Sequence, residues 1–182
     1  SIAIIGMRGR YPMADNLEEF WSNLVEGRDC ITEIPAERWD YRKYYDPNKE
    51  MYGKSYSKWG GFLNDVDKFD PLFFNISPVE AEFMDPQIRL SLESAWNAME
   101  DAGYTRKMLA SSRVGVFIGV MYGDYQHFVS KRGNAHLPAT SSYSAIANRI
   151  SYFFDFHGPS LAVDTMCSSS LTALHLACES IK

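Results

Sequence analysis

One stretch decides how this chain folds and points to its chemistry: Val163-Asp164-Thr165-Met166-Cys167-Ser168-Ser169-Ser170-Leu171. An apolar strand pattern ends there and a helical pattern begins, which predicts a tight strand-to-helix turn. At a helix start the thiol of Cys167 faces unpaired N–H groups and the positive end of the helix dipole, which favour the thiolate. Such a turn also lifts the side chain out of the sheet, and its backbone N–H can point at a developing oxyanion. The residues predict covalent acyl chemistry at this sulfur.

The residues around Cys167 are small and polar, unlike those around Cys30 and Cys178, which are predicted to be structural. Serines are poor residues for a helix interior, but in a first turn they can satisfy orphan N–H groups. The three serines that follow Cys167 are therefore expected to cap the helix.

No histidine of the chain is a convincing base for this nucleophile. His175 follows Cys167 by eight residues on the same predicted helix, about 12 Å of rise and beyond hydrogen-bond reach. His127, His136 and His157 stand in polar or loop sequence with no signature around them. We therefore expect a nucleophile without a base within this sequence.

Apolar runs of strand length indicate the sheet. They cover residues 2–7, 114–120 and 161–163, and residues 150–154 also have strand character after a helical pattern over 141–148. Gly115 and Gly119 share one strand face, where a neighbour could approach closely. Alternation of short buried strands with helices is typical of an α/β protein with a largely covered, mixed or parallel sheet.

Capping signals mark the helices. Asp15 or Asn16 starts a helix that ends before Gly27, and its apolar face predicts packing against a core. Ser77-Pro78-Val79-Glu80 is a capping box, Asp85-Pro86 restarts the helix, and Gly103 stops it. Capping explains Asp85 better than a catalytic carboxylate pair with Glu82. Residues 122–128 have a helical or turn-like pattern.

Residues 28–75 lack clear periodicity and are dense in Tyr and Trp. Long segments of this kind form either a substrate or partner platform or an ordered excursion pinned by its aromatic rings. The second interpretation is favoured here.

Composition narrows the class of protein. The 182 residues carry a net charge of -5 from interspersed acids and bases, which argues against a nucleic-acid partner. No apolar run has the length of a membrane span and no signal peptide is recognisable, so a cytoplasmic protein is expected. The 3 cysteines are widely spaced without a Cys-x-x-Cys pair, so neither a disulfide framework nor a metal site is predicted. The chain opens on a strand pattern and stops within a helical one, which predicts an excerpt of a longer polypeptide.

The segment from Asp164 to Leu171, preceded by Gly158-Pro159-Ser160, closely resembles the active-site segment of β-ketoacyl synthases, the ketosynthase domains of modular polyketide synthases. Met166 together with Asn148-Arg149-Ile150-Ser151-Tyr152 looks most like synthases whose acyltransferase acts in trans. Further segments occur in family order along the chain: Ile2-Ala3-Ile4-Ile5-Gly6-Met7, Phe20-Trp21, Phe69-Asp70-Pro71, Met84-Asp85-Pro86-Gln87 and Glu100-Asp101-Ala102-Gly103.

The resemblance implies a thiolase-like layered α/β fold and a homodimer, with residues 1–182 as the N-terminal part of a single ketosynthase domain. Cys167 would accept an acyl chain from the phosphopantetheine arm of an acyl carrier protein and pass it to a decarboxylated malonyl-carrier thioester. The enzyme would bind no cofactor of its own. The family's two active-site histidines and its lysine lie in its C-terminal half, so this sequence alone is expected to be inactive. The resemblance also places Met121, Tyr122 and Met166 beside the acyl channel or the dimer seam.

Two other readings remain open. A cysteine hydrolase would use the same nucleophile, but no protease signature surrounds Cys167 and no Gly-x-Ser-x-Gly elbow occurs. A non-condensing ketosynthase would keep the cysteine and act as an acyl-transfer and docking module. The nucleophile segment does not separate this last reading from a condensing enzyme.

Overall fold

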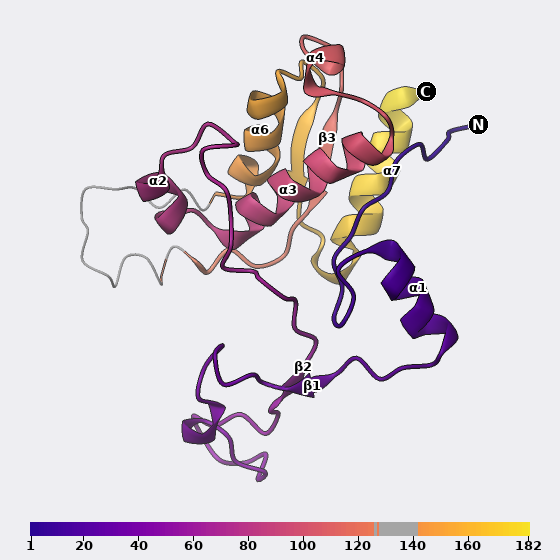
Figure 1. Cartoon of the computed structure of the whole chain (residues 1–182). Helices are drawn as coiled ribbons and strands as arrows, with labels where there is room; N and C mark the ends of the chain where they lie inside the picture. The colour runs from indigo at the N-terminus through magenta and orange to yellow at the C-terminus, as the bar shows by residue number, and fades with distance from the viewer. Residues whose placement is uncertain (126, 128–141) are drawn as a thin grey trace. The chain divides into compact units, whose positions relative to one another are not determined.

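A computed structural model describes residues 1–125, 127 and 142–182, drawn in Figure 1. The chain divides into two compact units, one formed by Gly9–Asp65 and the other by Ser1–Arg8 with Val66–Lys182. Each unit is described separately. No helix within the described ranges is long and apolar enough to span a membrane.

The larger unit is built on two parallel strands. β3 (Val116–Gly119) pairs with β4 (Ser160–Val163) in a register that sets Val116 opposite Ser160 and Gly119 opposite Val163. The strands predicted over residues 114–120 and 161–163 are confirmed, and their parallel pairing agrees with the expectation of a mixed or parallel sheet. An α/β unit of this kind brings the carboxyl ends of its strands to one edge.

Helices cover this pair of strands. α6 (Tyr143–Phe154) packs on β3, on β4 and on α3 (Pro86–Asp101), whereas α7 (Ser169–Ile181) packs on the strands from the side away from α6, as Figure 1 shows. The core between them contains the fully buried side chains of Ile88, Leu92 and Phe154. The shorter helices are α2 (Pro78–Phe83) and α4 (Arg106–Leu109).

The predicted helix starts in this unit are confirmed by their caps. The Ser77 hydroxyl accepts the Glu80 N–H at 3.1 Å, and the Asp85 carboxylate accepts the Gln87 N–H at 2.9 Å. The side chain of Glu80 pairs with Arg149 of α6, so it joins two helices. Gly103 has φ +76°, a left-handed conformation that ends α3 where the sequence predicts it.

The predicted strand over residues 150–154 is wrong, because these residues complete α6. Ile146, Ile150, Phe153 and Phe154 are buried and recur at helical spacing, so the apolar run is one helix face and has no strand period. Asp155 then ends the helix with a left-handed φ of 58°. Residue 141, the first of the helical pattern over 141–148, lies outside the described residues. In the segment 122–128, Tyr125 and His127 are helical, and residues 126 and 128 lie outside the described residues.

The strand predicted over residues 2–7 is also absent from the structure. The segment is neither strand nor helix, and the side chains of Ile4 and Ile5 are 80% and 64% exposed. It lies along α3, where the Met7 N–H donates to the Asp101 carboxylate at 2.8 Å. An apolar run of strand length needs a neighbouring edge to become a strand, and here it has a helix beside it.

The smaller unit contains α1 (Leu17–Val25), capped by Asn16 through the Glu19 N–H at 2.9 Å and followed by Gly27 at φ +63°. Both predicted ends of this helix are confirmed. The packing predicted for its apolar face is confirmed only in part: Leu17 and Phe20 are half-buried and Phe20 stacks on Tyr11 with ring centroids 3.9 Å apart, whereas Leu24 and Val25 are 55% and 68% exposed.

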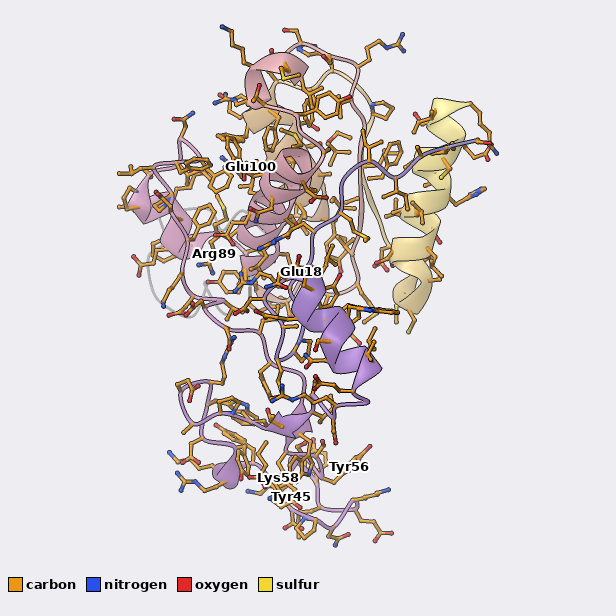
Figure 2. All side chains as sticks on the ribbon, turned by 45° about the vertical axis from the view of Figure 1, so that its right-hand side comes forward. Glu18, Tyr45, Tyr56, Lys58, Arg89 and Glu100 are labelled. Carbon is orange, nitrogen blue, oxygen red and sulfur yellow. The ribbon has the colours of Figure 1, made fainter. Side chains whose placement is uncertain are left out.

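The aromatic segment of the smaller unit is held partly by its own rings. β1 (Thr32–Glu33) pairs antiparallel with β2 (Trp59–Gly60), and the Lys58 ammonium lies 5.6 Å from the ring centroid of Tyr45, a pair labelled in Figure 2. The same ammonium lies 2.6 Å from the Glu33 carboxylate. That contact, followed by a hydrogen bond from the phenol of Tyr41, lowers the pKa of Glu33. The 3₁₀ turn η1 (Tyr41–Lys43) supplies this phenol.

Ring contacts therefore pin one part of the segment, as the favoured interpretation holds. Tyr52 is nonetheless 98% exposed and Tyr56 60%, so other rings of the segment are left at the surface.

Candidate active site

Cys167 lies in a short 3₁₀ turn, η2 (Met166–Ser168), between β4 and α7. The predicted strand-to-helix turn is confirmed, and the Cys167 side chain is exposed. Met166 has φ +59°, a left-handed conformation that is uncommon for a residue with a side chain. The Asp164 carboxylate accepts the Met166 N–H at 3.0 Å and so holds the turn in this conformation.

Gly119 brings the start of α7 onto the end of β3. A Cβ atom at this position would lie 2.5 Å from the Ser170 nitrogen and 2.8 Å from the Ser169 carbonyl carbon. Only a residue without a side chain therefore permits this approach, as the prediction of close contact at Gly119 implies. The site lies at the carboxyl ends of two parallel strands, where open α/β sheets commonly bind ligands.

The serines after Cys167 do not cap α7. The Ser169 hydroxyl, which is buried, accepts the Thr165 N–H at 2.9 Å and donates to the Met166 carbonyl at 2.7 Å. The Ser168 hydroxyl donates to the Thr165 carbonyl at 2.9 Å. The capping prediction is wrong because these hydroxyls tie the turn together instead. No side chain of the described structure caps the first turn of α7.

A cavity of about 470 Å³ opens beside the thiol. Its lining joins the start of α3, the end of β3 with the loop after it, and the turn from Cys167 into α7: Gln87, Gly119, Val120, Met121, Tyr122, Met166, Cys167, Ser169 and Ser170. Met121, Tyr122 and Met166 thus lie around the same cavity as Cys167.

Two side chains hold the loop that forms one wall of this cavity. The Gln87 amide nitrogen donates to the Tyr122 carbonyl at 2.7 Å, and the Tyr143 phenol donates to the Met121 carbonyl at 2.8 Å. Burial, and then the carboxylates of Asp164 and Asp124, raise the pKa of Tyr143. The phenol is therefore held in its neutral, donating form.

Sequence reasoning missed the roles of Gln87 and Tyr143 at this wall. Gln87 stands in the motif Met84-Asp85-Pro86-Gln87, whose residues predict a helix start and resemble a segment of the family without indicating a role for the glutamine. A polar side chain directly after a proline-initiated helix start is a weak signal, because such positions are commonly solvated.

The described histidines lie away from the lining of the Cys167 cavity. His175 is exposed on α7, and the ring of His157 lies 3.1 Å from the Asp155 carboxylate. The backbone N–H of His127 donates to the Asp124 carbonyl, and none of these three residues lines the cavity. His136 lies outside the described residues. The described part of the site therefore provides an exposed thiol and backbone N–H groups, and it brings no histidine to them.

The other two cysteines are not part of this cavity. Cys30 is half-buried, with its sulfur 3.6 Å from the Arg28 carbonyl oxygen, and Cys178 is half-buried on α7. Within the described ranges no group of three or more His, Cys, Asp or Glu residues is placed to hold a metal ion.

Comparison with known proteins gives this site its context. Residues 1–182 match the family model described as Beta-ketoacyl synthase, N-terminal domain. The chain is 60% identical over 191 residues to polyketide synthase PksL of Bacillus subtilis (strain 168). This alignment covers 100% of the chain and 4% of that protein. It is also 60% identical over 184 residues to polyketide synthase ThaG of Burkholderia thailandensis, in an alignment that covers 100% of this chain and 3% of that protein.

Solved structures agree with these relatives. The oxazolomycin ketosynthase domain OzmH KS7 of Streptomyces albus JA3453 superposes with a TM-score of 0.91 at 56% identity, over 98% of this chain and 31% of that one. The ketosynthase from module 6 of the bacillaene synthase of Bacillus subtilis 168 gives a TM-score of 0.82 at 45% identity, over 97% and 28%. The chain thus spans less than a third of these solved chains and a few per cent of the curated relatives. It belongs to the β-ketoacyl synthase family and matches the N-terminal ketosynthase domain of modular polyketide synthases.

Proposed function

We propose that Cys167 is the acyl-accepting nucleophile of a ketosynthase that forms carbon–carbon bonds during polyketide assembly. One observation carries this proposal: an exposed thiol at the β4–α7 turn, beside a cavity and at the start of a helix that no described side chain caps. Uncapped first-turn N–H groups are suited to stabilise a developing oxyanion.

The first half of the proposed reaction loads the enzyme. The Cys167 thiolate attacks the carbonyl carbon of an acyl thioester carried on the phosphopantetheine arm of an acyl carrier protein. The oxyanion of the tetrahedral intermediate accepts the Cys167 N–H. Its collapse breaks the bond to the arm, the arm's sulfur leaves as a thiolate that takes a proton, and the acyl group remains on Cys167.

The second half makes the new bond. A malonyl-carrier thioester loses carbon dioxide, and the electron pair of the broken bond becomes a carbanion next to the thioester carbonyl. This carbanion attacks the acyl carbon on Cys167, the carbon–sulfur bond breaks, and the thiolate is restored. The product is a β-ketoacyl chain on the carrier protein.

We propose further that residues 1–182 supply the N-terminal part of one ketosynthase domain of the trans-acyltransferase type, which works as a homodimer. The chain covers 31% and 28% of two solved ketosynthase chains, which supports its place as one part of such a domain. In this proposal the general acid and base groups come from the C-terminal half of the domain, since the described histidines do not line the Cys167 cavity.

The test uses the complete ketosynthase with an acyl-carrier thioester, followed by mass spectrometry of its peptides. We expect the acyl group on the peptide that contains Cys167, and no adduct in Cys167→Ala. Cys178→Ala, a half-buried cysteine of the same helix, is the matched control and should load normally. An adduct that persists in Cys167→Ala would reject the proposal.

A second measurement separates a condensing enzyme from a transfer module. The acylated ketosynthase is mixed with a malonyl-carrier thioester, and carbon dioxide and the β-ketoacyl product are quantified together. A condensing enzyme releases both in equal amounts. Stable acyl-Cys167 without either product would leave the transfer and docking role in its place.

A further inference from the structure

Gln87 is fixed in one orientation by two acceptors. Its amide nitrogen donates to the Tyr122 carbonyl at 2.7 Å, and the Asp85 carboxylate lies 3.4 Å from the same nitrogen. A flipped amide would turn its oxygen toward a carbonyl and a carboxylate, neither of which donates. The NH₂ group must therefore face these two acceptors.

Asp85 is the anchor of this arrangement. It is buried, and its second carboxylate oxygen accepts the backbone N–H of Gln87 at 2.9 Å. The same carboxylate thus restrains both the backbone and the side chain of Gln87. The contact with the Tyr122 carbonyl, at 2.7 Å, is the shorter of the two made by the amide nitrogen, so it sets the position of the amide at the cavity edge.

The Tyr122 carbonyl belongs to a loop that is held twice. Tyr143, the first residue of α6, donates to the preceding carbonyl, that of Met121. Gln87 comes from the first turn of α3, so side chains of two helices donate hydrogen bonds to two consecutive carbonyl groups of this loop. Both residues that carry these carbonyls line the Cys167 cavity, as does Gln87 itself.

We propose that Gln87 is a positioning residue for acylation: together with Tyr143 it fixes the Met121-Tyr122 wall of the Cys167 cavity, and this wall selects for extended acyl chains over acetyl. The inference rests on the proposed function of Cys167 as an acyl acceptor. An acetyl group carries a single methyl beyond the carbonyl carbon, whereas a longer chain needs an ordered apolar surface. Val120, Met121 and Met166 supply such a surface in this cavity.

The size of the effect follows from the lost hydrogen bond. A net contribution of about 1 kcal/mol for one such bond corresponds to about a fivefold change in an equilibrium constant. Replacing Gln87 should free the Met121-Tyr122 wall to move. A long acyl chain would then have to order this wall when it binds, so its affinity should fall by about this factor. The acetyl group makes little use of the wall and should lose little.

The experiment measures acyl transfer to Cys167 in the complete ketosynthase with acetyl-carrier and octanoyl-carrier thioesters. Gln87→Leu keeps the size of the side chain and removes its donors, and Tyr143→Phe removes only the phenol oxygen. Asn97→Leu is the matched control, an amide on the same helix outside the cavity lining. Alkylation of Cys167 by iodoacetamide reports whether the thiol itself remains equally accessible.

In both test variants the octanoyl-to-acetyl ratio of specificity constants should fall about fivefold, mainly through a higher half-saturating concentration of octanoyl-carrier thioester. Asn97→Leu should keep the ratio, and alkylation should be unchanged in all variants. Tyr143→Phe carries the test alone if Gln87→Leu does not fold. An unchanged ratio, or an equal loss for both chains, would overturn the inference. Absence of acylation in the unsubstituted enzyme would instead refute the proposed role of Cys167.

Discussion

Gly119→Ala tests whether the close approach of α7 to β3 positions the Cys167 thiol. The added Cβ atom would lie 2.5 Å from the Ser170 nitrogen, whereas ordinary contact begins at 3.4 Å, so the first turn of α7 has to retreat by about 0.9 Å. The atoms it meets are backbone and have no rotamer to escape into. Overpacking of this kind costs about 1–3 kcal/mol, and a misplacement near 1 Å can slow a positioned reaction about 10²-fold.

The assay combines urea unfolding with the rate of Cys167 acylation in the complete ketosynthase. Gly115→Ala is the control, since its Cβ atom would meet the edge of the Phe117 ring at 2.7 Å, a side chain that can turn aside, and Gly115 does not line the Cys167 cavity. We expect Gly119→Ala to lose both stability and acylation rate, and Gly115→Ala to keep its acylation rate. Normal stability and normal acylation in Gly119→Ala would show that this approach does not position the thiol.

Two further predictions concern stability. Ile88→Ala removes a side chain with 0% exposure between α3 and the strands, and should lower the free energy of unfolding by about 2–5 kcal/mol in urea titrations; a loss below about 1 kcal/mol would contradict the described core. Hydrogen bonds from Ser111 and then His157 lower the pKa of Asp155, so its carboxylate stabilises the fold above its unfolded pKa of about 3.9, and this contribution disappears as pH falls through the folded pKa. Asp155→Asn should therefore destabilise at pH 7 and approach the unsubstituted protein near pH 2; an equal difference at both pH values would count against this reasoning.

Local signals in the sequence predicted the helix starts well. Asn16, Ser77 and Asp85 cap helices as expected, because a cap depends on a side chain and N–H groups two or three residues away. Apolar runs were less informative. Residues 2–7 and 150–154 have similar apolar character, yet one lies along α3 and the other completes α6. Their conformation depends on neighbours distant in sequence, which a single run does not encode.

The candidate site likewise has a local part that the sequence predicts and a part that depends on residues distant in sequence. The turn around Cys167 is a local feature of its sequence, and the prediction of that turn is confirmed. The cavity wall depends on contacts across the chain: Gln87 reaches Tyr122 over 35 residues and Tyr143 reaches Met121 over 22. No local pattern records these contacts, so only the fold could reveal the roles of the two side chains.

The parallel pairing of β3 with β4 imposes an order on synthesis. Val116 cannot meet Ser160 until the chain between them has left the ribosome, and contacts between distant residues form more slowly than local ones. Helix α7 packs on both strands, so its contacts with them form only after the helix itself has been synthesised. A nascent chain therefore has no organised turn at Cys167 until translation has passed well beyond this residue.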